Sequence, residues 1–233
     1  MSDGGQASVA ARIPGAAGLG LVAPPGAPTM PAALLAEPDR AAELIEARTP
    51  LRVADTRVAA TVWWYSASIV LMGPALAGLV TGVPLSGRLT DTALVFRPDG
   101  LPVAAVSSAP GDDVAVELRG TLAAVVAAVA AAGRMGEPPL WAIATDSIAN
   151  QLLALGRAVG DVTAATAHAP ALAAAIGPPL PVPRYVDVAG TRFTRRASCC
   201  LMVELPGGSL CTSCPRRTPA ERQLLLERAA GRW

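Results

Sequence analysis

Four cysteines, the only ones in this 233-residue chain, lie close together near its C-terminal end. They are Cys199, Cys200, Cys211 and Cys214, with the spacing Cys-Cys-x10-Cys-x2-Cys. Four thiolates are the ligand set of a tetrahedral zinc ion or of an iron–sulfur cluster. The one histidine, His168, lies in an Ala-rich stretch, where we expect a surface or capping position. A histidine-ligated Rieske cluster is therefore excluded.

The vicinal Cys199-Cys200 pair favours a 2Fe-2S cluster over zinc. A zinc ion usually takes its four sulfurs from two chelating C-x2-C loops, whereas a 2Fe-2S cluster divides its ligands between two irons. The chain begins Met-Ser-Asp without a secretory signal, which indicates a reducing compartment. We therefore expect a metal site rather than disulfides, one of which would be a strained vicinal bridge. Structural zinc stays an alternative.

Local sequence predicts how these cysteines are positioned. The segment LMVELPGGSL between Cys200 and Cys211 has strand-forming residues around a Pro-Gly-Gly turn, so we expect a β-hairpin that brings the two cysteines together. Neighbouring residues of a regular strand point to opposite faces, and ligation by both Cys199 and Cys200 therefore predicts an irregular backbone at 198–200. After the last cysteine, Thr218-Pro219-Ala220-Glu221 predicts a capped helix that ends at Gly231.

Arginines surround the cysteines. From Thr191 onward the chain has 8 Arg and 3 acidic residues, a balance of +5, whereas the rest has 11 against 15, a balance of −4. A 2Fe-2S cluster with four thiolates carries about −2 when oxidised and about −3 when reduced, so nearby cations favour the reduced form. Solvated side chains are the alternative. The candidate contacts for a substrate or an electron donor are Arg195, Arg196, Arg216 and Arg217.

These residues carry a resemblance to a known family. An Arg-containing segment before Cys199-Cys200, a Leu-Pro-Gly-Gly turn and a closing Cys-x2-Cys-Pro resemble the ferric-siderophore reductases of the FhuF type. The resemblance covers about the last forty residues. It implies that Cys199, Cys200, Cys211 and Cys214 bind a 2Fe-2S cluster, and that the helical part, similar to the C-terminal region of NRPS-independent siderophore synthetases, holds the ligand.

The expected function is one-electron reduction of a ferric siderophore with release of ferrous iron. The sequence has no flavin or nicotinamide motif, so we expect an external electron donor, a ferredoxin or a flavoprotein. Only 3% of residues are aromatic, which argues against nucleic-acid binding. We expect a cytoplasmic protein, with peripheral association at the inner face of the membrane as an alternative. The rival functions are a non-redox ligand-binding module with structural zinc, and an iron–sulfur electron carrier or redox sensor.

The remaining pattern predicts an α+β fold: a predominantly helical domain with a small antiparallel β component, followed by the Cys-rich segment. Residues 1–30 are rich in Gly, Ala and Pro and predict a disordered lead. Residues 31–180 form the expected helical domain and 181–233 the cluster-binding segment. The expected elements are a helix from Pro38 to about Arg48 stopped by Pro50, a hairpin over 92–108, and helices over 121–132, about 141–159 and 162–176.

Residues 58–87 form an uncharged segment long enough to cross a bilayer. Gly73-Pro74 interrupts this segment and Gly82 ends it, which favours a buried helix broken at Gly73 over a membrane span. We expect Trp63 and Trp64 in this segment, and Trp141 further on, to lie in the core.

Overall fold

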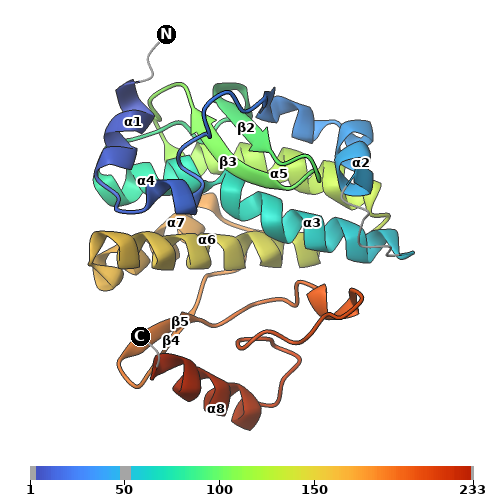
Figure 1. Cartoon of the computed structure of the whole chain (residues 1–233), viewed down its shortest axis with the longest axis vertical. Coiled ribbons are helices and arrows are strands. Elements are labelled where there is room, and N and C mark those ends of the chain that lie inside the picture. Colours follow the sequence, from blue (N-terminus) through green and yellow to red (C-terminus); the bar gives the residue numbers. More distant parts are fainter. Residues whose placement is uncertain (1–3, 48–53, 232–233) are drawn as a thin grey trace.

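The computed structural model of the protein describes residues 4–47 and 54–231. It is predominantly helical with a small antiparallel β component, as predicted. Figure 1 shows a helical body that carries a three-stranded sheet and, on the other side of α6, a smaller C-terminal segment. The two parts are joined by residues 177–184, which contain no helix or strand. A domain division near residue 180 stays a prediction.

The elements are as follows. The α-helices are α1 (Gly4–Ala11), α2 (Pro38–Ala47), α3 (Thr56–Leu71), α4 (Gly73–Thr81), α5 (Val114–Ala132), α6 (Pro138–Val159), α7 (Val162–Ile176) and α8 (Pro219–Ala230). The short 3-10 helices are η1 (Ala16–Leu19), η2 (Ala32–Ala36), η4 (Leu89–Asp91) and η5 (Met202–Glu204). The strands are β1 (Thr29–Pro31), β2 (Thr92–Phe96), β3 (Pro102–Ser107), β4 (Tyr185–Val188) and β5 (Thr191–Thr194).

The uncharged segment forms α3 and α4, and the chain breaks at Gly73-Pro74 as predicted. Pro74 lies in the first turn of α4, where its missing N–H costs nothing, and Gly82 ends α4 in a left-handed conformation. Trp63 and Trp64 are 1% and 0% exposed, which confirms that they belong to the core. Helix α3 is fixed to α6 by a hydrogen bond from Trp64 Nε1 to the carbonyl of Leu140 (2.9 Å).

The predicted hairpin over 92–108 is confirmed as β2 and β3, paired antiparallel with Leu94 opposite Ala105. Gly100 takes a positive φ of 76° in the turn between them. Strand β1 adds to the edge of β2, giving the order β1-β2-β3. The sheet lies across α3 and α4, which contact β3 (Figure 1).

Helices α5, α6 and α7 supply much of the remaining core. Helix α5 begins at Val114, earlier than predicted, because Asp113 caps it by accepting hydrogen bonds from the amides of Ala115 and Val116. Helices α6 and α7 occur where predicted, with Gly160 closing α6. Trp141 on α6 is 3% exposed, as expected of a core residue.

The N-terminal prediction is wrong for the described residues. Instead of a disordered lead, residues 4–31 form α1, η1 and β1. Val9 on α1 and Ile13, just after the end of that helix, are buried in the core. The buried Gln6 fixes this segment to the sheet, since its side-chain amide donates to the carbonyl of Ala105 (2.7 Å) and its oxygen accepts from the amide of Ser107 (2.6 Å). A few apolar anchors and one glutamine therefore order a segment of low complexity.

The expected end of α2 lies partly outside the described residues. Helix α2 begins at Pro38 as predicted, and Ala41, Leu44 and Ile45 are buried. Arg48 and Pro50, the predicted last residue and stop of this helix, fall in the part of the chain that the structure does not describe.

Two helical stretches are long and apolar enough to cross a membrane by length and composition, Thr56–Thr81 and Val114–Ala132. In the most apolar 18-residue stretch of each, 61% and 56% respectively is buried inside the structure. Such burial is typical of core helices, which pass the same test of length and composition.

Candidate iron–sulfur site

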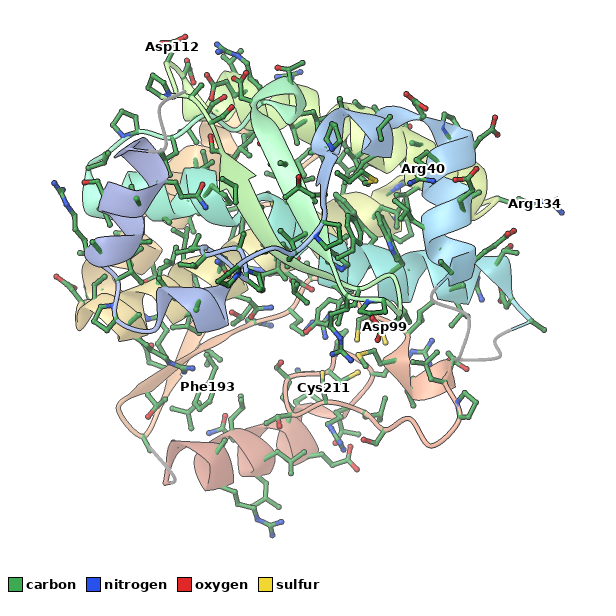
Figure 2. The ribbon with its side chains drawn as sticks, turned by 45° about the horizontal axis from the view of Figure 1, so that its top comes forward. Arg40, Asp99, Asp112, Arg134, Phe193 and Cys211 are labelled. Carbon is green, nitrogen blue, oxygen red and sulfur yellow. The ribbon has the colours of Figure 1, made fainter. Side chains whose placement is uncertain are left out.

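The four cysteines lie in the connection between β5 and α8, on the side of α6 that faces away from the sheet (Figure 1). None of the four is disulfide-bonded in the structure. Cys200 and Cys214 are 6% and 2% exposed, Cys199 is half-buried and Cys211 is exposed. Figure 2 shows sulfur atoms gathered near the label of Cys211. The site is thus buried on one side and open to solvent on the other.

The sequence-predicted hairpin between Cys200 and Cys211 does not form. The segment instead contains η5 and a tight turn, and the only strands of the described C-terminal segment, β4 and β5, precede the cysteines. Leu201 adopts a left-handed conformation (φ 59°) that starts η5. The amide of Gly208 donates to the carbonyl of Leu205 (2.8 Å), and a Cβ at Gly208 would clash with the carbonyl of Met202. The chain between Cys200 and Cys211 therefore reverses direction through local turns and not through the predicted pairing of two strands.

Cys200 and Cys211 nevertheless converge, and the side chain that they share is Arg196. Its Nη1 lies 3.4 Å from the Sγ of Cys200 and 3.5 Å from the Sγ of Cys211. The backbone of Ser198–Cys200 is irregular, as predicted. The prediction that Cys200 and Cys211 come together is confirmed. The predicted cause, a β-hairpin, is replaced by local turns and a shared contact with the Arg196 guanidinium.

Arg196 is buried, and its side chain is 3% exposed. Its guanidinium carbon lies 4.8 Å from the centre of the half-buried Tyr65 ring of α3, within the range of a cation–π contact. Burial acts to lower the pKa of Arg196, but the hydrogen bond to Cys200 and the surrounding negative charge outweigh it, and the pKa is raised. Arg196 therefore carries a permanent positive charge against the sulfurs.

Asp146 on α6 fixes Arg196 from the other side. Its Oδ2 accepts hydrogen bonds from Arg196 Nε and from the amide of Ser198 (both 3.2 Å), and its Oδ1 accepts from the amide of Ala197 (2.6 Å). Burial raises the pKa of the Asp146 carboxyl, and these hydrogen bonds and the charge of Arg196 oppose the rise. Because every one of these partners is a donor, Asp146 accepts them as a carboxylate.

The other predicted arginines have separate roles. Arg216 forms an exposed ion pair with Glu204. Arg217 donates to the carbonyls of Cys211 and Leu210 and so fixes the backbone at that cysteine. Arg195 is exposed. Arg196 differs from the other three, because its side chain is enclosed by α3, α6 and the cysteine segment and does not face solvent, where a substrate or donor would approach.

Helix α8 follows the last cysteine as predicted. Thr218 accepts a hydrogen bond from the amide of Glu221, and the Glu221 carboxylate accepts from the amide of Thr218, which completes a capping box. From this helix Arg222 donates to the carbonyl of Cys214 (3.3 Å).

The residues present suit a 2Fe-2S cluster in their chemistry. Four cysteine sulfurs are the ligand set of such a cluster. Two buried donors of the same segment, Arg196 Nη2 and Ser198 Oγ, have no hydrogen-bond partner in the structure. Buried donors are normally satisfied, and thiolate and sulfide sulfurs accept such bonds. Within the described residues no three His, Cys, Asp or Glu side chains are already gathered at metal-binding distances.

Asp146 and Tyr65 are the site residues that sequence reasoning missed. A signal for Asp146 exists, since it is the only acidic residue of the 22-residue helix α6 and lies among apolar positions. A carboxylate at such a position is rarely buried unless it is paired. His168 lies on α7 and is half-buried, whereas all four cysteines lie after β5.

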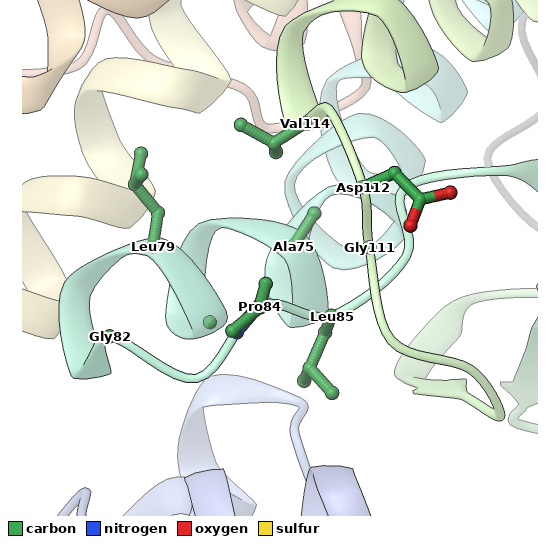
Figure 3. Close-up of a pocket in the computed structure, with 9 residues that line it drawn as sticks. Ala75, Leu79, Gly82, Pro84, Leu85, Gly111, Asp112 and Val114 are labelled. Carbon is green, nitrogen blue, oxygen red and sulfur yellow. The ribbon is translucent and has the colours of Figure 1, made fainter.

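The described pockets include one beside the cysteine segment and one far from it. A polar hollow of about 500 Å³ lies between the start of α3 (Asp55, Arg57) and residues 204–206. A smaller, mainly apolar pocket of about 200 Å³ lies between α4 and residues 111–114 (Figure 3). Figure 2 shows Asp112, which lines this apolar pocket, at the opposite side of the molecule from Cys211.

Comparison with known families gives one match. Residues 196–216 match the family model described as the FhuF 2Fe-2S C-terminal domain. The match spans all four cysteines and agrees with the resemblance to FhuF-type ferric-siderophore reductases that their spacing indicated; its cofactor is a 2Fe-2S cluster. It does not extend to the helical part. No curated protein matches the chain.

Proposed function

We propose that this protein is a 2Fe-2S ferric-siderophore reductase, with Cys199, Cys200, Cys211 and Cys214 as the cluster ligands. The observation that carries the proposal is the pairing of two of these sulfurs with a buried guanidinium, inside the segment that matches a 2Fe-2S domain. When bound, the cluster supplies one electron at a time, which is the number that reduces ferric to ferrous iron in an oxygen-donor chelate.

Arg196 has a direct role in this proposal. Its charge lies within 3.5 Å of two sulfurs and cannot be lost at neutral pH, because the pKa of this guanidinium is raised further. A fixed cation at this distance stabilises the additional negative charge of the reduced state. A structural zinc site undergoes no such change of charge, so the arginine would stabilise its thiolates without favouring one redox state over another.

The exposed side of the site suits electron exchange with partners. Cys211 is exposed and Cys199 half-buried, so an electron donor can approach from solvent. The exposed Arg195 lines a hollow with Ser213, between the last two cysteines, and its charge favours an acidic donor such as a ferredoxin or a flavoprotein. The charge of Arg216 is balanced by Glu204. The protein therefore operates with an external electron donor.

The ferric siderophore is proposed to dock in the hollow between the start of α3 and residues 204–206. This hollow, about 500 Å³, has the size of a small-molecule site and joins the helical part to the cysteine segment. Arg57 lines this hollow and is paired with Asp55 (3.3 Å), so its loss would leave the carboxylates of Asp55 and Glu204 facing an anionic chelate. Substitution Arg57→Glu is expected to raise the KM for an anionic ferric siderophore, whereas Arg12→Glu, beside Thr81 at the far end of α4, leaves KM unchanged.

The decisive experiment is anaerobic purification followed by metal analysis and a single-turnover test. The proposal predicts about two irons and two acid-labile sulfides per chain, visible cluster absorption, and reoxidation of the reduced protein by a ferric siderophore. One zinc without sulfide would refute it. If the protein holds a cluster that no ferric chelate reoxidises, the reductase proposal fails and an electron carrier or redox sensor is the remaining function.

A further inference from the structure

Asp146 fixes the polypeptide that leads directly into the first cysteine. We propose that Asp146 is the positioning residue of the iron–sulfur site, which holds residues 196–198 in place and sets Arg196 against the sulfurs of Cys200 and Cys211. The inference rests on the proposed function in one respect, because it takes the four cysteines as the cluster ligands.

The hydrogen bonds of Asp146 all go to one stretch of chain. Its two oxygens accept from three consecutive residues, Arg196, Ala197 and Ser198, at 3.2, 2.6 and 3.2 Å. Cys199 follows immediately. The Asp146 side chain is 1% exposed, so water does not compete for these bonds, and charge-assisted bonds in such surroundings are strong. One carboxylate therefore determines where the ligand segment begins.

The anchor itself is rigid, whereas the segment that it holds has little regular structure. Next to Asp146, Ser147 forms a buried hydrogen bond with Ser68 of α3 (2.7 Å), and Ile143 and Ile148 are fully buried. Between β5 and α8, in contrast, η5 is the only helix or strand among the described residues. The position of the ligand segment is therefore set by the helical body.

The charges give this role an electrochemical readout. Arg196 lies between the Asp146 carboxylate and two sulfurs, so the carboxylate opposes the addition of an electron that the guanidinium favours. Loss of the Asp146 charge should therefore raise the reduction potential of the loaded protein. A residue that only supports folding would not produce a shift with a defined sign.

The test compares Asp146→Asn with a matched buried carboxylate on the far side of the molecule. Glu117 has a side chain that is 1% exposed and accepts from the amides of Gly87 (2.9 Å) and Asp112 (3.1 Å) and from Arg88 (3.0 Å). Substitution Glu117→Gln thus makes the same chemical change in a similar environment. We expect Asp146→Asn to raise the potential in a spectroelectrochemical titration and Glu117→Gln to leave it unchanged.

Amide hydrogen exchange gives a second readout, which does not depend on activity. An asparagine at position 146 keeps one acceptor oxygen and turns an NH₂ group toward other donors, so Ala197 or Ser198 loses its partner. We expect exchange at that amide to become about tenfold faster or more, the effect of losing a hydrogen bond to a charged acceptor. Glu117→Gln should not change exchange at either amide.

Asp146→Glu carries the test if Asp146→Asn fails to fold, since it retains the charge and moves the carboxylate by one methylene group. The inference then requires faster exchange at Ala197 or Ser198 and an altered cluster spectrum. Unchanged exchange together with an unchanged potential and spectrum would overturn it, as would an equal shift in Glu117→Gln. None of these measurements uses a siderophore, so a protein that responds as expected but fails to reduce ferric chelates refutes the proposed function alone.

Discussion

Replacing the buried ion pair by neutral residues should lower the reduction potential of the protein. The substitution is the double variant Arg196→Gln/Asp146→Asn. Both residues must be changed together, because Arg196→Gln alone would leave the carboxylate buried without a cation. The double variant leaves the net charge of the pair unchanged. It removes the dipole of the ion pair, whose positive end lies against the sulfurs and whose negative end lies on α6.

The magnitude follows from the distances. The guanidinium lies 3.4 Å from the sulfur of Cys200, and the Asp146 oxygen lies a further 3.2 Å from the Nε of Arg196. With an effective dielectric constant of about 20, the attraction of the cation for an added electron exceeds the repulsion by the carboxylate by about 2 kcal/mol. The electron is shared over the whole cluster, which reduces the effect. About 2 kcal/mol corresponds to about 85 mV, since 59 mV is about 1.4 kcal/mol for one electron, so a fall of roughly 50 to 80 mV is expected.

The assay is an anaerobic spectroelectrochemical titration of the loaded protein. The matched control is Arg88→Gln/Glu117→Gln, which removes an ion pair of 3.0 Å between a buried carboxylate and an arginine on the opposite side. This control should leave the potential unchanged. A double variant at Arg196 and Asp146 that binds the cluster and keeps the wild-type potential would refute the electrostatic argument.

Three further predictions concern folding of the body and of the closing helix. Thr218→Ala removes the N-cap of α8 and should destabilise that helix by about 1 kcal/mol, measured as faster amide exchange within it. Gly78→Ala places a Cβ 2.6 Å from the carbonyl oxygen of Val83 and should lower the thermal midpoint, whereas Gly120→Ala, with open space around it, should maintain or raise it. The hydrogen bond from the Thr218 amide lowers the pKa of Glu221 below 4.5. The contribution of Glu221 to α8 is therefore complete above about pH 4.5 and lost as the pH falls through the lowered folded-state pKa, and Glu221→Gln should abolish this dependence in exchange measurements.

Elements with local signals were predictable from sequence. Gly73-Pro74 stops α3 and begins α4 because proline fits only the first turn of a helix, and Gly160 ends α6 with a positive φ. The capping box of α8 is likewise encoded by neighbouring residues. In each case the interactions that decide the structure lie within a few residues of one another.

Elements without local signals were predicted wrongly. The N-terminal segment becomes ordered because Gln6 pairs with the edge of β3, about a hundred residues away in the chain. The segment between Cys200 and Cys211 has the composition of a hairpin, yet Leu201 adopts a left-handed conformation and turns the chain into η5. Tertiary contacts and backbone turns outweigh β propensity here, which depends strongly on context.

The amino-acid sequence is sufficient to predict the ligand set: the four thiols, their spacing, the excess of arginine beside them and the capped helix that follows. Which arginine contacts the sulfurs depends on the fold. Arg196 and its neighbour Arg195 are equivalent in the sequence, but the first is enclosed against Asp146 and Tyr65 while the second faces solvent. A buried guanidinium needs a carboxylate to balance its charge. For Arg196 this carboxylate is Asp146, which lies fifty residues earlier in the chain, on α6.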